Sequence, residues 1–415
     1  MTRNPFKGLP WQEKLTFGAL SLALVSIVLW WRIGILAVGL LVAASVVKLI
    51  STRKLGNPAL DRPQRVCLWA MVAYWLLYAV SAIVSTDHAE GWATASTKLH
   101  FLLLPLLCLC NDTSYLTRNR LRALFQVLTA TLLVRFVACL VIDGIQYLKG
   151  IPLATLKDWQ MEPLGLHHNY LALYLVTALA FLYTQFARID RSTRKRMILL
   201  IPAAIALITY LFLSSSRSGI ITLALLLTTC LSHLVFIRKR YKAALIVVLF
   251  SGVLATGLFL CMPSLGARFS ALHKNRVPDE REILWNCGMK TAQEKLLFGY
   301  GSGDYMPPLM EAYTQRGYHK AVQETLGTHN QYLETVLETG IVGLAFMLFM
   351  LFAPLALSLG KKRRNLLVTL TVLVIASQIM FESMLNRQMG AQFIALVYCL
   401  LILSLTTQNE KAIAS

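Results

Sequence analysis

The sequence predicts an all-α polytopic membrane protein with about twelve transmembrane helices and one long periplasmic loop containing short helices. Three observations predict this class. Hydrophobic residues make up 56% of the 415 residues and charged residues only 14%, against about 25% in soluble domains. Apolar stretches long enough to cross a bilayer recur along the chain. Basic residues gather in alternate connections between those stretches.

The apolar stretches divide the chain into three parts. Residues 1–262 are expected to hold nine spans, residues 263–330 a periplasmic loop region, and residues 331–415 three further spans. Each span is placed where about 20 predominantly apolar residues stand between polar turns. The expected spans are 15–31, 33–50, 66–85, 97–110, 123–143, 169–187, 197–213, 219–237, 243–262, 331–358, 366–385 and 390–407.

The formal net charge of +20 is interpreted as a sign of topology. Lysine and arginine concentrate in the short turns on one side, which predicts that this side, with both termini, is cytoplasmic. An excess of basic residues in short membrane turns points to membrane lipids as neighbours and argues against a nucleic-acid partner. The basic runs are Lys48–Arg65, Arg118–Arg122, Arg188–Arg196, Arg238–Lys242 and Lys361–Arg364.

The long outer segment contains two readable pieces. Pro278 and Asp279 open an expected helix ending at Gly299, on which Arg281, Trp285 and Gly288 share one face. The stretch Gly299–Tyr305 follows, and it lacks the Gly-Lys-Ser/Thr ending of a phosphate-binding P-loop. Either it is a flexible or tightly turned loop, or its glycines allow close backbone approach to a ligand.

The segment that enters the tenth span carries a histidine. Thr328 and Gln331 form a capping-box pattern, which places His329 in the first turn of a helix. The positive end of a helix disfavours imidazolium, so His329 is expected to be neutral near pH 7. A neutral imidazole can accept a proton, and the same helix end favours an anionic ligand such as a diphosphate.

A serine-rich turn between the seventh and eighth spans carries Arg217. A guanidinium beside hydroxyl and backbone donors is suited to binding an oxyanion, with Ser216 and Ser218 as further donors. The alternative is an interfacial arginine that extends to lipid headgroups.

Other polar residues lie in or beside spans, and each has two open interpretations. Arg135 is expected to face the interior, either in a structural pair with Asp143 or Glu382 or against a lipid phosphate. Glu382 and Arg387 form a helix-end salt bridge or line a site. Lys98 is an interfacial anchor or a site residue.

The chemistry favoured by these residues is one general base together with electrostatic stabilisation of a phosphate leaving group. The sequence shows no carboxylate cluster suited to Mg²⁺ and no zinc-ligand spacing, so no metal and no cofactor are expected.

At these residues the chain resembles the superfamily of bacterial O-antigen ligases and O-antigen polymerases. The matching motifs are Ser-Ser-Ser-Arg217-Ser-Gly, the helix with Arg281 and Trp285, the Gly-Tyr-Gly-Ser-Gly stretch, and Thr-His329-Asn330-Gln-Tyr-Leu-Glu-Thr-Val-Leu-Glu-Thr-Gly340. The resemblance covers about residues 165–390, and the histidine motif is its most specific part.

The resemblance implies an O-antigen ligase of the bacterial inner membrane with its active site facing the periplasm. Such an enzyme moves a glycan from undecaprenyl diphosphate to a hydroxyl of the lipid A-core oligosaccharide, with inversion and without nucleotide or metal. Arg217 and Arg281 would bind the donor diphosphate, and His329 would act as the base or orient it. Glu382 would stand where many ligases have Asp. Supporting roles for Lys98, Arg135, Asn330 and Arg387 match no firm motif, and the loop with Tyr305 would move over the glycan.

Two alternatives stay open. A polymerase that joins repeat units on the same lipid carrier would share the fold and motifs. A lipid or polysaccharide transporter belongs to another class, but transporters usually place polar sites near the bilayer midplane and show internal repeats. Here the polar groups gather at the outer interface, which favours the enzyme.

Overall fold

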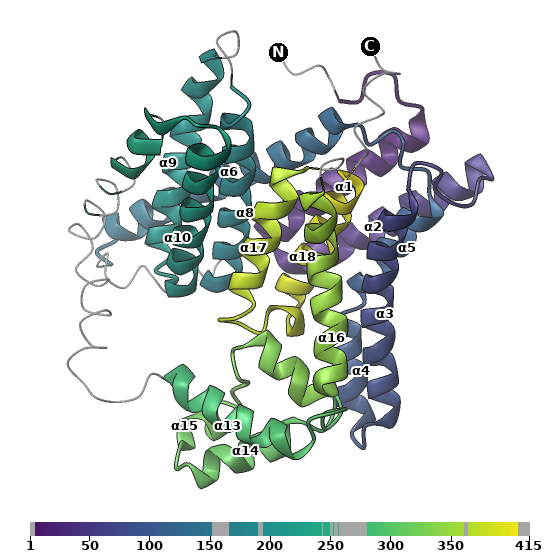
Figure 1. The fold of residues 1–415 in the computed structure, drawn as a ribbon, viewed down its shortest axis with the longest axis vertical. Coiled ribbons are helices and arrows are strands. Elements are labelled where there is room, and N and C mark those ends of the chain that lie inside the picture. Colours follow the sequence, from purple (N-terminus) through teal and green to yellow (C-terminus); the bar gives the residue numbers. More distant parts are fainter. Residues whose placement is uncertain are drawn as a thin grey trace.

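The computed structural model describes residues 5–151, 166–189, 194–242, 244–249, 252, 256, 280–360 and 364–405. Within these residues every regular element is helical (Figure 1). The helices are α1 (Trp11–Leu29), α2 (Trp31–Thr52), α3 (Arg62–Val84), α4 (His88–Thr97), α5 (His100–Cys110), α6 (Arg118–Leu148), α8 (His168–Phe186), α9 (Met197–Leu213), α10 (Arg217–Ser232), α13 (Glu280–Glu294), α14 (Met306–Gln315), α15 (His319–Gln323), α16 (Gln331–Leu359), α17 (Leu366–Gln378) and α18 (Gln388–Leu403).

Several of these helices are long and apolar enough to cross a membrane, which makes the chain a multi-pass membrane protein. Among the described residues seven helices qualify, and the pair α4–α5, bent by 45°, makes an eighth. The helices α9, α17 and α18 are apolar but shorter. The expected span 243–262 falls largely outside the described residues, so the structure leaves the predicted total of twelve as an expectation.

The span α8 occupies the centre of the bundle. Its apolar window is 83% buried, whereas that of the span beginning at α10 is 28% buried. Helices α6, α9, α10 and α17 all pack against it. Residues at the ends of α8 therefore lie inside the protein, where polar side chains need partners.

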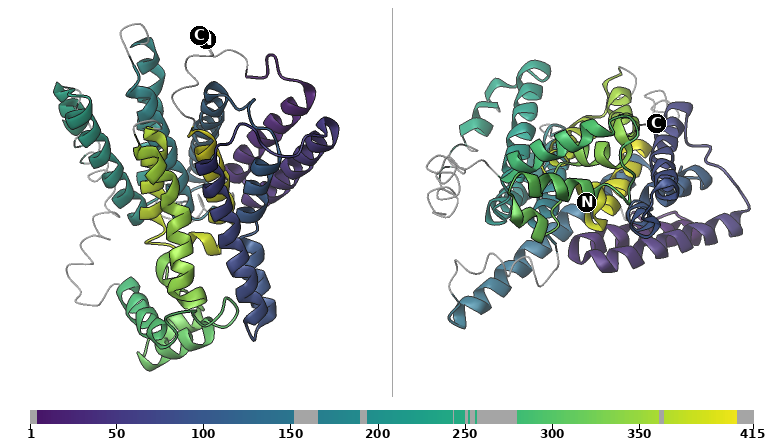
Figure 2. Two further views of the ribbon diagram at one scale, coloured as in Figure 1. Left: turned by 45° about the vertical axis from the view of Figure 1, so that its right-hand side comes forward. Right: turned by 90° about the horizontal axis from the view of Figure 1, so that it is seen from below.

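Helices α13, α14 and α15 form a separate layer across one end of the bundle (Figures 1 and 2). Helix α13 packs on α14 and on α16, so this layer is joined directly to a span. The expected helix between Pro278 and Gly299 is shorter in the structure, where α13 ends at Glu294, and the residues before Glu280 lie outside the described part.

Two spans are interrupted near that same end. Helix α16 is broken at Gly340, whose φ of 69° and ψ of −169° are not helical. A Cβ at this glycine would lie 2.1 Å from the carbonyl oxygen of Leu297, so only glycine fits. The expected span 366–385 is also wrong at its outer end, because α17 stops at Gln378 and an irregular segment leads to α18.

The opposite end of the bundle gathers the turns expected in the cytoplasm. Arg120, near the start of α6, donates hydrogen bonds to the carbonyls of Pro5 and Lys7. Gln64, in the first turn of α3, donates to the carbonyl of Ile402 near the end of α18. The two ends of the bundle therefore differ. One end carries the basic turns, and the other carries the α13–α15 layer.

Candidate functional site

The serine-rich turn between α9 and α10 is held against α8. Ser215 adopts a φ of 54°, which lets the chain reverse within a few residues. Ser216 caps α10, because its Oγ accepts from the backbone N–H of Gly219 at 3.2 Å. A Cβ at Gly219 would lie 2.7 Å from Cβ of Ala172, so the turn and α8 approach closely.

The hydroxyls of this turn bind one asparagine. Ser216 and Ser218 are fully buried, and each donates its Oγ hydrogen to Oδ1 of Asn169 at 3.0 Å. With these protons engaged, the two serines contact Asn169 instead of presenting free donors to a ligand. Arg217, which stands between them at the first position of α10, is exposed.

Asn169 also binds Glu382. Its Nδ2 donates to Oε2 of Glu382 at 2.7 Å. Glu382 lies in the irregular segment after α17, and Nδ1 of His329 lies 2.9 Å from its other oxygen, Oε1. The chain therefore brings the serine turn, the start of α8, the segment after α17 and the entry to α16 into one hydrogen-bonded network.

The electrostatics of this pair favour charges on both partners. Burial alone would raise the pKa of Glu382, but the hydrogen bond and charge of His329, together with Asn169, lower it to about 2. The hydrogen bond to Glu382 raises the pKa of His329, and burial offsets part of that increase. Because Glu382 is a carboxylate, it accepts the hydrogen on Nδ1, which leaves Nε2 to face other partners.

The expectation for the environment of His329 is wrong in two respects. Asn330, and not Thr328, caps α16, because Asn330 Oδ1 accepts from the N–H of Leu333 at 3.2 Å. His329 therefore stands before the helix, with a φ of 50°. Its pKa moves upwards, opposite to the expected direction, because the hydrogen bond and charge of Glu382 outweigh burial and the charge of Arg281.

The predicted face of α13 packs beside this pair. The guanidinium of Arg281 lies 5.7 Å from the ring centroid of Phe381, and the ring of Trp285 lies 6.4 Å from it. A Cβ at Gly288 would lie 2.9 Å from Cγ2 of Thr328. Arg281 thus lies next to Phe381, the residue that precedes Glu382. Its positive charge acts to lower the pKa of His329.

A second cluster of polar residues lies on the first turns of α16. Glu334 is buried, and its Oε1 accepts from the hydroxyl of Tyr305 at 3.0 Å. Its Oε2 accepts from Oγ1 of Thr328 at 3.2 Å and from Oγ of Ser383. Thr328, which precedes His329, and Ser383, which follows Glu382, are therefore anchored to the same carboxylate.

Asn386 connects this cluster to Lys98. Its Nδ2 donates to Glu334 Oε1 at 3.2 Å and to Glu338 Oε1 at 2.6 Å, and its Oδ1 accepts from Lys98 Nζ at 2.7 Å. Lys98 and Glu338 are fully buried, and Tyr78 touches both of them. The interpretation of Lys98 as an interfacial anchor is wrong, because its cation is enclosed by the bundle.

The glycine-rich stretch is tightly turned and firmly held. The N–H groups of Tyr300 and Gly301 donate to carbonyls of α16, and Asp304 accepts from the N–H groups of Thr86 and Asp87 at 2.7 and 2.8 Å. A Cβ at Gly303 would lie 2.1 Å from the carbonyl oxygen of Asp87. The glycines allow close approach between loops, and Tyr305 is buried on Glu334, so this geometry opposes the expectation that the stretch moves over a glycan.

The remaining predicted residues lie outside the hydrogen bonds of the His329–Glu382 network. Arg387 is exposed at the cap of α18, and Glu382 pairs with His329 instead of forming the suggested helix-end salt bridge. Arg135 is fully buried and donates to the carbonyls of Val28 and Leu29 at 2.9 and 3.0 Å and to the hydroxyl of Tyr210 at 3.2 Å. These contacts take the place of the expected carboxylate partner.

Two histidine rings lie side by side at the start of α8. The rings of His167 and His168 are 3.9 Å apart, because His167 precedes the helix as its cap. In the described part of the chain, no group of three or more His, Cys, Asp and Glu side chains could hold a metal ion.

Sequence reasoning missed four members of these networks: Asn169, Glu334, Glu338 and Asn386. One signal was available, because Glu334 and Glu338 stand one turn apart in an otherwise apolar helix, where carboxylates are costly. The assembled site can abstract one proton at His329 and offers guanidinium groups nearby for an anion.

Comparison with known proteins agrees with the motifs. Residues 202–348, from α9 into α16, match the family model described as O-antigen ligase. This part of the chain is therefore similar to O-antigen ligases and polymerases, which are glycosyltransferase-like enzymes of lipopolysaccharide and polysaccharide synthesis. It includes Arg217, Arg281 and His329, whereas Asn169 and Glu382 lie outside it. No curated protein matches the chain.

Proposed function

We propose that the protein is an O-antigen ligase of the bacterial inner membrane. It would transfer a glycan from undecaprenyl diphosphate to a hydroxyl of the lipid A-core oligosaccharide at the periplasmic face, with inversion of the anomeric centre. The proposal includes about twelve spans with both termini in the cytoplasm. It is supported by the family match and by the polar networks at the bundle end that bears the α13–α15 layer.

The hydrogen bond between His329 and Glu382 carries the proposal. Glu382 holds the hydrogen of Nδ1, so Nε2 of the neutral imidazole is the basic atom. The side chain of His329 is 36% exposed, whereas that of Glu382 is 10% exposed. General-base catalysis needs a base that a substrate can reach and a buried carboxylate that orients it. His329 and Glu382 have this arrangement.

The transfer step then follows from this geometry. The acceptor oxygen attacks the anomeric carbon while its proton passes to Nε2 of His329. The bond from that carbon to the diphosphate oxygen breaks on the opposite face, and the leaving group departs with the electron pair. Arg217 and Arg281 would stabilise the negative charge that develops there, which is the step where fixed cations lower the barrier.

The two serines would act on this step through Asn169. By holding Oδ1 of Asn169, Ser216 and Ser218 direct its Nδ2 towards Glu382, which in turn fixes the ring of His329. Arg217, set between them, is then carried by the same turn that orients the base. Three further residues would help to keep His329 in place. Asn330 caps α16, Tyr305 donates a hydrogen bond to Glu334, and Lys98 donates one to Asn386, which binds both buried glutamates.

Reconstitution of the reaction tests the proposal. Full-length protein in detergent would receive an undecaprenyl diphosphate-linked glycan and lipid A-core, in EDTA and without nucleotide. We expect glycan on lipid A-core with the wild type and with His319→Ala, an exposed histidine of α15, and none with His329→Ala at equal protein level. A ladder of longer carrier-linked glycans with untouched acceptor would instead establish a polymerase. Full activity of His329→Ala would refute the base assignment, and no product from the wild type would return a transporter to contention.

A further inference from the structure

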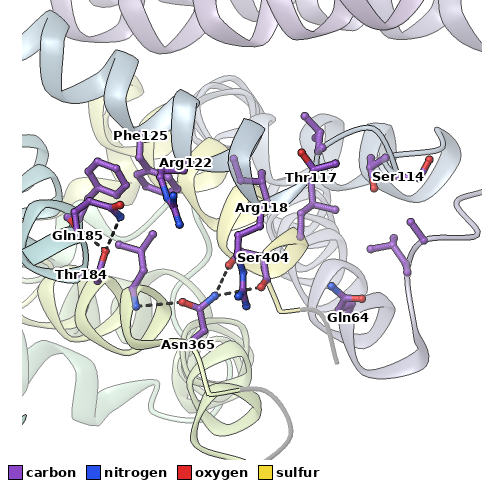
Figure 3. Close-up of a pocket in the computed structure, with 18 of the residues that line it drawn as sticks. Gln64, Ser114, Thr117, Arg118, Arg122, Phe125, Thr184, Gln185, Asn365 and Ser404 are labelled. Atoms are coloured by element: carbon purple, nitrogen blue, oxygen red, sulfur yellow. Dashed lines mark hydrogen bonds between the residues drawn. The ribbon is translucent and has the colours of Figure 1, made fainter. Parts of the chain in front are cut away.

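A cavity of about 570 Å³ lies at the end of the bundle opposite to His329. It is lined by the start of α3 and the turn before it, the turn before α6, the first turns of α6, the end of α8, the start of α17 and the end of α18 (Figure 3). Pockets of this size hold organic ligands. The basic turns around it belong to the side that the charge pattern assigns to the cytoplasm.

Three arginines line the cavity: Arg118 and Arg122 from α6, and Arg188 after α8. Arg118 and Arg122 are one turn apart and so lie on the same face of α6. Burial and then the charges of Arg122, Arg118 and Arg238 lower the pKa of Arg188, so these cations lie within electrostatic reach of one another. Among the described residues that line the cavity there is no aspartate or glutamate to balance them.

One arginine donor and one helix start at the cavity lack a side-chain partner in the described part of the chain. Nε of Arg122 is buried and makes no hydrogen bond there. The start of α6 also lacks a side-chain cap, because Thr117 accepts no hydrogen bond from its first turn. A buried guanidinium donor beside an uncapped helix N-terminus favours an anion, and Figure 3 shows Arg122 extending from α6 between Gln185 and Arg118.

Part of the cavity lining is apolar. Phe125 and Phe181 stack with ring centroids 5.5 Å apart, and Leu121 and Leu403 lie beside them. A soluble anion such as free phosphate would leave these apolar side chains facing water. A ligand with one anionic and one apolar part covers the basic and the apolar lining residues together.

We propose that this cavity binds a phosphate-bearing amphiphile, with the phosphate on Arg118, Arg122 and the start of α6 and the apolar part on Phe125 and Phe181. Guanidinium forks bind phosphate oxygens in a bidentate manner. Basic pockets between spans on the cytoplasmic side are suited to anionic lipid headgroups. Two phosphate sources share this chemistry: an anionic lipid and a small soluble phosphate.

Ligand binding to the full-length protein in an uncharged detergent tests the proposal. Phosphatidylglycerol, phosphatidylcholine, glycerol 3-phosphate and inorganic phosphate would each be titrated, with bound adducts counted by native mass spectrometry and the thermal midpoint recorded. The variant Arg118→Gln/Arg122→Gln removes two charges from the cavity. The matched control Arg53→Gln/Lys54→Gln removes two charges from an exposed turn expected on the same side.

We expect phosphatidylglycerol to bind the wild type and the control alike, and the cavity variant at least tenfold more weakly. Thr117→Asp gives a second test that does not rely on losing contacts. It supplies the missing cap of α6 and places a carboxylate where the phosphate would lie, so it should raise the thermal midpoint without lipid and abolish the shift caused by phosphatidylglycerol.

Three results would overturn the proposal. Equal binding of phosphatidylcholine would show an apolar groove without anion selectivity. An equal loss of phosphatidylglycerol affinity in the cavity variant and in the control would show that the lipid responds to the overall positive charge of this side and not to the cavity. Inorganic phosphate or glycerol 3-phosphate binding as tightly as phosphatidylglycerol would show a soluble-anion site. None of these readouts depends on glycan transfer, so the outcome is independent of the proposed function.

Discussion

Asn169 donates a hydrogen bond of 2.7 Å from Nδ2 to Oε2 of Glu382, although the two residues are 213 positions apart in the chain. The same side chain accepts from Ser216 and Ser218, so Asn169 joins the turn that carries Arg217 to the acid behind His329. Its role in the proposed reaction is positioning, because it touches Glu382 and not the reacting atoms.

We expect Asn169→Ala to lower kcat by roughly 10- to 100-fold, the cost of losing one or two hydrogen bonds to a charged group. The effect should fall on kcat more than on the KM for donor, because the arginines remain. The exposed Asn119→Ala serves as the control. Steady-state transfer kinetics of the two variants decide the matter, and an unchanged kcat would remove Asn169 from the positioning network.

Glu382→Gln should change the pH dependence of transfer. The pKa of His329 is raised above 6.5 by Glu382, so kcat/KM for the wild type should rise with pH through an inflection above 6.5, as the imidazolium loses its proton. Without the carboxylate the inflection should move to lower pH, while the plateau falls by about 100-fold or more because the ring loses its orientation. A pH–rate profile of both proteins measures this, and superimposable profiles would contradict the pairing.

The same pair should stabilise the fold in a defined pH window. The raised pKa of His329 adds stability below 6.5 that is lost as pH rises through its folded value. The lowered pKa of Glu382 adds stability above 4.5 that is lost as pH falls towards about 2. The difference in thermal midpoint between wild type and Glu382→Gln should therefore be largest between pH 4.5 and 6.5.

Arg217 and Arg281 should not tolerate lysine. A point charge cannot replace a bidentate fork on a diphosphate, so Arg217→Lys and Arg281→Lys should each weaken donor binding about tenfold or more. Arg316→Lys, at the exposed end of α14, is the matched control. Donor affinity measured with a lipid-linked glycan tests this, and normal affinity in either variant would exclude that arginine from the diphosphate site.

The sequence predicted the helical segments better than the contacts between them. Apolar length located the qualifying spans, and helical spacing identified the face of α13 that packs beside Phe381. The end of α17 was misplaced because the irregular segment after Gln378 begins with Ile379, Met380 and Phe381, which hydropathy cannot distinguish from helix.

The environment of His329 could not be read from its own segment. Thr328 and Asn330 are both good caps, and local sequence does not rank them. The partner that sets the pKa of His329 lies 53 positions away, and the partner of Lys98 lies 288 positions away. Such contacts are decided by how the spans pack, which periodicity and composition do not specify.

Lys98 offers the clearest stability test, because its cation is enclosed. Nζ donates to Asn386 at 2.7 Å and lies 4.1 Å from the ring centroid of Tyr78, and both of these residues also bind Glu338. Lys98→Met would leave Glu338 buried without this cation, which should cost about 3–5 kcal/mol. Lys290→Met, an exposed lysine of α13, should be neutral.

Removing the opposing charge should reverse the loss. In Lys98→Met/Glu338→Gln the amide keeps the hydrogen bonds of Tyr78 without a buried charge, so the thermal midpoint in detergent should recover most of the decrease. If Lys98→Met has the same thermal midpoint as the wild type, the cation is not essential to this cluster. If the double variant melts as low as the single one, the loss comes from packing of the lysine stem and not from an uncompensated carboxylate.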